Sequence, residues 1–243
     1  MDFQKNIFTS LYARLINPFL QKYDFLSAQR PDVLVANSEN TRKRIKKYYH
    51  RDAVVIYPPV WLPVNNLTMK QFNNFRSYFL IVSRIVGGKG LKMAVQTCYE
   101  LNLPLKVVGQ AAGWSSEYPE LRKIAGPYIE FLGAVSDQDL VKLYSGAKAF
   151  VATTRDEDFG ITPVEAMLCG TPVIAYRGGG YLETVMEGVT GVFFDDYSIT
   201  GLKAGIEKFK IQSRLGGTKF KVAEIQKQAQ KFSKKVFIKK INV

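Results

Sequence analysis

The chain has 243 residues, of which 47% are hydrophobic and 23% charged, and a formal net charge of +13. This length suffices for one α/β domain with a full core plus a partial second unit, and the composition excludes disordered and fibrous proteins. No apolar run approaches the roughly 18 residues that a membrane-spanning helix needs, and residues 1–4 have neither a basic lead nor a small-residue cleavage site, so we expect a cytoplasmic protein.

The positive charge is concentrated in the two flanks. Residues 1–50 carry a net +5 and residues 201–243 a net +10, whereas residues 51–200 carry −2. A nucleic-acid binder normally places its basic residues on the functional face of its core, so we expect no nucleic-acid partner. Basic flanks instead favour a peripheral contact with the inner face of an anionic membrane, or with another protein. Cys98 and Cys169 are not spaced like a metal-binding or disulfide pair, so we expect both to be reduced residues of the core.

Residues 1–62 predict a helix followed by a β-α-β unit. Apolar residues recur at helical intervals over residues 2–26, although Pro18 should bend or interrupt the helix. Residues 33–36 predict a short buried strand, Ser38 a helix N-cap, and residues 53–57 a second strand. We expect a polar linker over residues 63–76.

The rest of the chain alternates short strands with helices. The strands are predicted at residues 78–83, 105–108, 129–132, 149–152, 172–175 and 191–193. The helices are predicted at residues 91–101, 117–125, 137–146, 163–168, 181–187 and from about 198. This alternation predicts an α/β domain over residues 77–210 with a Rossmann-like, doubly wound parallel sheet, which binds ligands at the carboxyl ends of its strands. Residues 211–243 predict a basic C-terminal helix.

A glycine-rich loop with two cations follows the strand at residues 78–83. Arg84 comes first, and Lys89 and Gly90 directly precede the next helix. Strand, glycine loop and helix in this order can cradle a phosphate, because the helix N-terminus adds its own positive field. The loop is not a Walker loop, since Gly90 stands where Ser or Thr would be. The alternative is that both cations are solvated loop charges.

Two glutamates, Glu157 and Glu165, flank a strand-to-helix loop. We expect Glu157 on the loop and Glu165 in the first turn of a helix that Thr162 and Pro163 open, so that both can face one ligand. Local alternatives stay open. Thr162 and Glu165 also fit a capping box with Pro163 at the first helical position, and Glu157 could be one of three solvated acids at residues 156–158.

The pair resembles the Glu-x7-Glu signature of the retaining glycosyltransferases with two Rossmann domains (the GT-B fold), called group 1 or family 4. Further matches run in order along the chain: Ala36-Asn37-Ser38, Tyr57-Pro58-Pro59-Val60, Ser83-Arg84, Lys89-Gly90, Val107-Val108-Gly109, Phe131-Leu132-Gly133, Gly179-Gly180 with Glu183, and Gly188-Thr190-Gly191. The EDFGI form of residues 157–161 looks most like the mannosyltransferase-like branch.

The resemblance implies roles for matching residues. Glu157 would contact the transferred sugar and steady the charge at its anomeric carbon, Arg84 and Lys89 would hold the donor diphosphate, and Glu165 would bind the ribose hydroxyls. The remaining donor-site residues implied are Ser83, Gly109, Val135 and Asp137, where the last two lie beside the base, and the backbone N–H groups of Phe159, Gly160, Ile161 and Thr162.

The resemblance also implies the reaction. The donor would be a nucleoside-diphosphate sugar of the GDP or UDP type, the acceptor a glycan or a lipid-linked sugar in surface polysaccharide synthesis, and transfer would retain the anomeric configuration without a metal or other cofactor. Family members have a whole first Rossmann domain for the acceptor, whereas here residues 1–62 match only its last β-α-β portion. A partner chain would then supply the acceptor half, or the gene is split or degraded.

Two alternatives belong to other classes. A non-catalytic nucleotide-sugar-binding or regulatory protein would keep the donor site without turnover. A nicotinamide oxidoreductase or a basic nucleic-acid binder would share only the α/β pattern and the charge. Residues 107–111 lack the full glycine fingerprint of dinucleotide binding, which weighs against the oxidoreductase.

Overall fold

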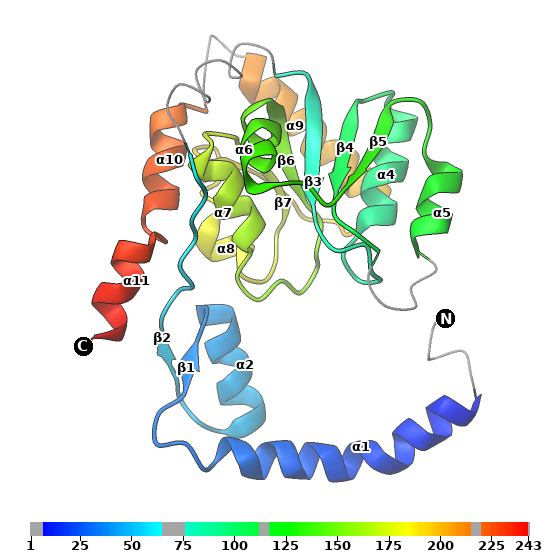
Figure 1. Ribbon diagram of the computed structural model, residues 1–243. Coiled ribbons are helices and arrows are strands. Elements are labelled where there is room, and N and C mark those ends of the chain that lie inside the picture. The colour runs from blue at the N-terminus through cyan, green and yellow to red at the C-terminus, as the bar shows by residue number, and fades with distance from the viewer. Residues whose placement is uncertain (1–6, 65–75, 112–116, 215–219, 243) are drawn as a thin grey trace.

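A six-stranded parallel sheet forms the main domain of the computed structural model, which describes residues 7–64, 76–111, 117–214 and 220–242 (Figure 1). From edge to edge the strands are β5 (Ile129–Gly133), β4 (Leu105–Val108), β3 (Tyr78–Val82), β6 (Ala147–Ala152), β7 (Val173–Tyr176) and β8 (Gly191–Phe194). All neighbouring pairs are parallel. The chain runs outward from β3 to β5 and then crosses to β6, so the predicted doubly wound sheet is confirmed. The carboxyl ends of β3 and β6 meet where the strand order reverses, the position at which such sheets bind ligands.

Helices cover both faces of this sheet. The core on one face joins the sheet to α4 (Leu91–Glu100), α5 (Glu117–Ile124) and α9 (Ile199–Arg214). The core on the other face joins it to α6 (Asp137–Ser145), α7 (Ile161–Leu168), α8 (Tyr181–Thr184) and α10 (Val222–Gln230). Because both faces are buried, strands β3, β7 and β8 are continuous apolar runs rather than alternating ones.

The N-terminal unit is a small β-α-β motif, as predicted. Strands β1 (Val35–Ala36) and β2 (Val54–Val55) pair in parallel on either side of α2 (Glu39–Tyr49) in the sequence. The hydroxyl of Ser38 accepts a hydrogen bond from the backbone N–H of Thr41 at 2.9 Å, which confirms the predicted N-cap. The prediction of a buried strand at residues 33–36 is wrong. Val33 and Val35 are 64% and 58% exposed, because alternate strand residues point to opposite faces and only the face of Leu34 and Ala36 is covered.

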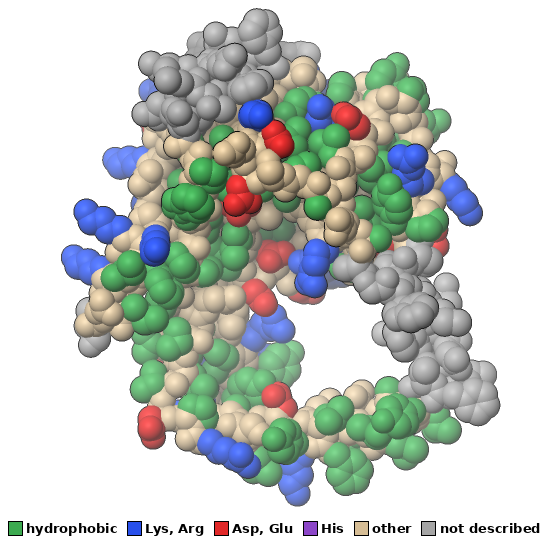
Figure 2. All heavy atoms as spheres, viewed as in Figure 1, with side chains coloured by type: hydrophobic (Ala, Val, Ile, Leu, Met, Phe, Trp, Pro, Cys, Tyr) green, Lys and Arg blue, Asp and Glu red, His purple; other side chains and the backbone are tan. Residues whose placement is uncertain are grey.

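Helix α1 (Ile7–Ala28) extends along the molecule at a distance from the sheet (Figure 1). It runs through Pro18 without interruption and curves, because a single proline removes one backbone hydrogen bond while the flanking turns keep theirs. Leu11, Leu15 and Phe19 are each more than half exposed, and Figure 2 shows hydrophobic side chains along this helix.

The C-terminal tail forms two helices where one was expected. Helix α10 ends at Gln230 and α11 (Lys234–Ile241) follows. Between them the buried Phe232 is anchored, since its carbonyl oxygen accepts a hydrogen bond from the N–H of Val60 at 2.8 Å. The tail therefore returns to the N-terminal unit. Most of the expected linker, residues 65–75, lies outside the described residues, and α9 runs past the expected boundary at residue 210.

Candidate functional site

A cleft of about 210 Å³ opens at the carboxyl ends of β3 and β6. The residues that line it come from the end of β3, the glycine loop, the end of β6, the acidic loop and the first turns of α7 and α8: Ile81, Val82, Ser83, Arg84, Lys89, Phe150, Val151, Ala152, Thr153, Thr154, Glu157, Ile161, Thr162 and Tyr181. The cleft thus lies at the reversal of the strand order, where the sequence predicts the ligand.

The glycine loop is fixed against the end of β6. Gly90 has a φ of +71° and precedes α4, and a Cβ atom there would lie 2.5 Å from the carbonyl oxygen of Thr153. The hydroxyl of Thr153 in turn donates a hydrogen bond to the carbonyl oxygen of Lys89 at 2.8 Å. Only glycine combines this backbone conformation with so close an approach, so the loop holds Lys89 at the cleft.

Opposite charges meet inside the cleft. The Nζ atom of Lys89 lies 3.2 Å from Oε2 of Glu157, and the two side chains are 29% and 23% exposed. Arg84 lines the same cleft from the end of β3 and is exposed. The structure therefore brings together the three residues predicted to be catalytic. It places Lys89 and Glu157 in a shared ion pair rather than as separate solvated charges.

The loop that carries Glu157 rests on the turn between β7 and α8. The N–H of Gly180 donates to the carbonyl oxygen of Glu157 at 2.7 Å. A Cβ atom at Gly179 would lie 2.3 Å from that same oxygen, and one at Gly180 would lie 2.4 Å from Cα of Phe159. Two consecutive glycines therefore let the two backbones touch, which fixes the position of Glu157.

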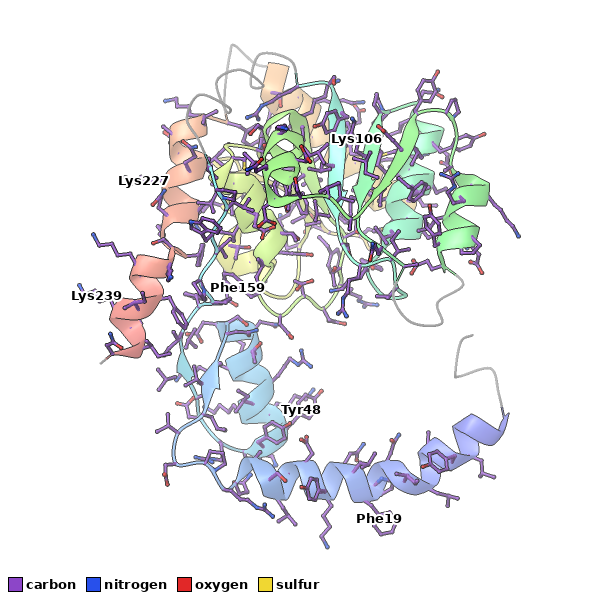
Figure 3. The ribbon with its side chains drawn as sticks, viewed as in Figure 1. Phe19, Tyr48, Lys106, Phe159, Lys227 and Lys239 are labelled. Atoms are coloured by element: carbon purple, nitrogen blue, oxygen red, sulfur yellow. The ribbon has the colours of Figure 1, made fainter. Side chains whose placement is uncertain are left out.

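Phe159 is an anchor of the fold and does not line the cleft. Its side chain is 2% exposed and lies with its ring centroid 5.6 Å from that of Tyr57 and 5.2 Å from that of Phe232. Figure 3 shows it where the main domain meets the N-terminal unit and the tail. Its ring ties these three parts of the chain together, and only its backbone remains a candidate for ligand contact.

Helix α7 begins two residues earlier than predicted. Gly160 is its N-cap with a φ of +91°, and no side chain caps it. Thr162 and Pro163 are therefore the second and third helical residues, and Glu165 lies in the second turn rather than the first. The capping box is wrong, because the left-handed conformation of Gly160 turns the chain into the helix before Thr162 is reached.

Glu165 faces α6 instead of the helix end. Its carboxylate accepts a hydrogen bond from the hydroxyl of the buried Tyr144 at 2.8 Å. Burial raises the pKa of Glu165 above its ordinary value, the bond from Tyr144 opposes this shift, and the charge of Asp137 adds to it. Glu165 is therefore held from α7 against Tyr144, near the C-terminal end of α6.

Other predicted donor-site residues also lie outside the cleft lining. Gly109 has a φ of +134°, and a Cβ atom there would lie 1.9 Å from the carbonyl oxygen of Ser83, so it supports the cleft from behind. Val135 is partly buried against the core and Asp137 is the exposed first residue of α6. Ser83, Ile161 and Thr162 do line the cleft, whereas Gly160 precedes it as the cap of α7.

Several lining residues were missed from the sequence. Thr153 and Thr154 directly follow β6, and their position after a buried strand was a signal for the carboxyl edge of the sheet. No local signal points to Tyr181 or to Tyr144, which donates to Glu165, because a tyrosine in a helix is usually predicted to be a core residue.

Helix α2 is bound to the edge of this cleft by charged contacts. The carboxylate of Glu183 accepts hydrogen bonds from the backbone N–H groups of Glu39 at 2.8 Å and Asn40 at 2.9 Å. This is the favoured position for an anion, at the positive end of a helix dipole. The side-chain amide of Asn40 donates to the carbonyl oxygen of Glu157 at 3.3 Å, and Arg44 pairs with Asp158 at 2.5 Å.

The described ranges contain neither a grouped set of metal ligands nor a membrane-spanning helix. Within these ranges, no three or more His, Cys, Asp or Glu side chains are grouped as a metal ion would require. Among the described helices, none combines the length and the apolar character needed to cross a membrane.

Residues 67–232 match the family of group 1 glycosyl transferases, and the chain belongs to this family. Over 268 aligned positions it is 27% identical to the alpha-1,3/1,6-mannosyltransferase ALG2 of Mus musculus, an alignment that covers 96% of this chain and 62% of the relative. An uncharacterized glycosyltransferase, MJ1178 of Methanocaldococcus jannaschii, is 25% identical and covers 72% of this chain and 48% of its own length. The chain thus spans 62% and 48% of the length of these two relatives, less than two thirds of each.

Solved structures share the fold. Anabaena Alr3699/HepE in complex with UDP-glucose superposes with a TM-score of 0.78 at 21% identity and covers 91% of this chain and 66% of that one. A glycosyltransferase from Rickettsia africae has a TM-score of 0.72 at 19% identity, and the alignment covers 98% of this chain and 81% of that one. These structures confirm the α/β architecture of a GT-B glycosyltransferase.

Proposed function

We propose that the cleft between β3 and β6 binds a nucleoside-diphosphate sugar and serves as the donor site of a retaining hexosyltransferase. The observation that carries this proposal is the convergence of Arg84, Lys89 and Glu157 on one cleft at the reversal of the strand order. Two cations next to a helix N-terminus suit a diphosphate, and a carboxylate opposite them suits a sugar that becomes positively charged.

Each group has a role in the reaction. The bond from the anomeric carbon to the diphosphate oxygen breaks, and Arg84 and Lys89 stabilise the charge that the leaving diphosphate gains. Glu157 stabilises the positive charge on the sugar. The acceptor hydroxyl forms the new bond on the face that the diphosphate leaves, and its proton passes to a departing phosphate oxygen. The anomeric configuration is thereby retained, and no metal takes part.

The nucleoside end of the donor is assigned to the region of α6 and α7. Glu165 accepts hydrogen bonds from the ribose hydroxyls, and residues 135–137 lie beside the base. Tyr144 holds Glu165 in place for this task through its hydroxyl. The bound UDP-glucose of the Anabaena structure and the mannosyl transfer named for the ALG2 relatives support a hexose donor, of the UDP or GDP type.

The acceptor and the location are proposed more broadly. A glycan or lipid-linked acceptor in surface polysaccharide synthesis and a cytoplasmic location at the inner face of the membrane remain predictions. The exposed Leu11, Leu15 and Phe19 on α1 support an apolar contact through this helix.

Proton NMR of donor turnover tests the proposal. The chain is incubated in turn with GDP-mannose and UDP-glucose, with and without glycan acceptors, and the anomeric signal of the transferred or released sugar is followed. We expect donor consumption with an α-configured first product. A β-configured first product, or a chain that neither binds nor consumes any donor, overturns the proposal. Tight donor binding without turnover would instead favour the non-catalytic alternative.

A further inference from the structure

A second cavity, of about 420 Å³, lies between α2 and the acidic loop that carries Glu157. Its lining comprises Asn40, Lys43, Arg44, Lys47 and Tyr48 from α2 and Asp156 from the loop. Residues three and four positions apart share one face of a helix, so the cations of α2 project together. Three cations face one carboxylate here. Figure 2 shows charged side chains around the open space between the main domain and α1.

Two of these three cations lack a counter-ion. Arg44 is paired with Asp158 at 2.5 Å. Lys43 and Lys47 make no ion pair within the described ranges, and both are exposed. Like charges four residues apart on a helix destabilise it by a few tenths of a kcal/mol, so Lys43 and Lys47 do not stabilise α2. An anion between the two ammonium groups would remove that repulsion.

The cavity adjoins the donor cleft without sharing its cations. Asn40 lines the cavity and donates to the backbone carbonyl of Glu157, and Asp156 precedes Glu157 in the loop. The donor cations Arg84 and Lys89 lie across this loop, in the other cavity. An anion held by Lys43 and Lys47 is therefore a different group from the donor diphosphate.

A larger cavity continues from this one. About 810 Å³ in volume, it lies between α1 and α2, shares Arg44 and Tyr48 with the basic cavity, and has Pro18, Phe25 and Ile45 in its walls. Figure 3 shows Tyr48 on the side of α2 away from β1 and β2. The walls of this larger cavity are mixed, since Pro18, Phe25 and Ile45 are apolar whereas Lys22, Asp24 and Asp158 are charged.

We propose that Lys43 and Lys47, with Arg44, bind a phosphate or diphosphate ester of the acceptor. This rests on the proposed function, because it takes the phosphate ester to belong to the acceptor, whose reacting hydroxyl must reach the face of the sugar that the donor diphosphate leaves. The shared chemistry is the phosphate group, carried either by a soluble sugar phosphate or by an alkyl chain. An alkyl chain would extend into the cavity walled by Pro18, Phe25 and Ile45.

Binding of two phosphorylated probes tests the site. Glucose 1-phosphate and farnesyl diphosphate are titrated into the chain, its Lys43→Gln/Lys47→Gln double variant, the charge-preserving Lys43→Arg/Lys47→Arg variant and Lys46→Gln. Lys46 is an exposed lysine of the same helix that does not line the cavity, so its variant is the matched control. Loss of two charge-assisted hydrogen bonds predicts about tenfold or more weaker binding in the double Gln variant alone. Stronger binding of the alkyl probe supports a lipid-linked source, and stronger binding of the sugar phosphate a soluble one.

Two further arms separate this site from the donor site. Lys89→Gln should weaken binding of UDP and GDP but leave the Lys43-dependent probe binding in place, whereas the double Gln variant should do the reverse. If the chain binds neither nucleotide, the donor assignment fails while the probe result still stands. The phosphate site is overturned if the double Gln variant binds both probes like the parent chain, or if Lys46→Gln loses as much affinity.

Discussion

Lys89 and Glu157 form an ion pair of 3.2 Å that joins the glycine loop after β3 to the acidic loop after β6. Both side chains are partly screened from solvent, and both loops are held from behind, by Thr153 and by Gly180 respectively. Together the two side chains contribute no net charge to the cleft. An entering diphosphate must therefore compete with Glu157 for the ammonium group of Lys89.

This competition makes Glu157→Gln an informative variant. Removal of the carboxylate frees Lys89 and removes a repelling charge, so we expect UDP or GDP to bind a few-fold more tightly, as suits a partly exposed pair worth about 1 kcal/mol or less. Sugar transfer should be lost, since the sugar no longer has its stabilising carboxylate. Calorimetry and a transfer assay measure the two effects. Asp158→Asn, on the same loop but paired with Arg44, should leave nucleotide affinity unchanged; weaker nucleotide binding in Glu157→Gln would contradict the assigned role.

Glu165→Gln is expected to stabilise the protein at neutral pH. Burial raises the pKa of Glu165, so the folded chain keeps the proton to a higher pH than the unfolded chain does. Its contribution to stability is complete below the ordinary pKa and is lost as the pH rises through the raised value. The variant cannot titrate at this position, and its melting temperature should exceed that of the parent chain at about pH 7 but not at about pH 4.

The same variant should bind nucleotide at least about tenfold more weakly, because a charged hydrogen-bond acceptor for the ribose is lost. Glu130→Gln, at an exposed position on β5, is the control for both readouts. A lower melting temperature of Glu165→Gln than of the parent chain at neutral pH would show that the ionised carboxylate of Glu165 does not destabilise the fold.

Glu183→Ala should loosen the N-terminal unit. Its carboxylate accepts hydrogen bonds from the N–H groups of Glu39 and Asn40 at the start of α2. Loss of such a cap lowers the free energy of unfolding by about 1–2 kcal/mol. Urea unfolding should show this decrease in the free energy of unfolding, with a smaller decrease for Glu183→Gln, which keeps one acceptor oxygen. Equal stability of Glu183→Ala and the parent chain would mean that the contact does not hold α2 in place.

Two alanine variants of one loop test the packing of the glycine turn. Gly90→Ala needs a positive φ and sets its Cβ atom 2.5 Å from the carbonyl oxygen of Thr153, so it should lose about 2–3 kcal/mol of stability and displace Lys89. At Gly87 an added Cβ atom meets nothing within 4 Å, so Gly87→Ala should change little. Similar unfolding midpoints for the two variants would refute the close approach.

The sequence predicts the order of elements well because each strand is a short apolar run closed by glycine or polar residues. It fails where a backbone conformation or a distant partner decides. The pattern Thr162, Pro163, Glu165 fits a capping box, but the positive φ of Gly160 starts α7 earlier. The exposure of Val33 depends on which layers cover a two-stranded sheet, and no local pattern records that.

In the candidate site, too, contacts that the strand order predicts differ from contacts that depend on packing. Arg84, Lys89 and Glu157 could be predicted to meet, because each follows a strand of one parallel sheet and such strands share an edge. The contact between Glu165 and Tyr144 could not, since it depends on the packing of α6 against α7.

Arg84 and Lys89 are proposed to bind the diphosphate of a nucleotide. Calorimetric titration of the chain with UDP, GDP and ADP, repeated on Arg84→Ala, Lys89→Ala and Lys148→Ala, tests this claim most directly. Lys148 is exposed near the amino end of β6, the opposite edge of the sheet. We predict that one of the nucleotides binds, about tenfold or more weakly in the first two variants and unchanged in Lys148→Ala. Binding that is equal in all four proteins, or absent for all three nucleotides, would contradict the claim.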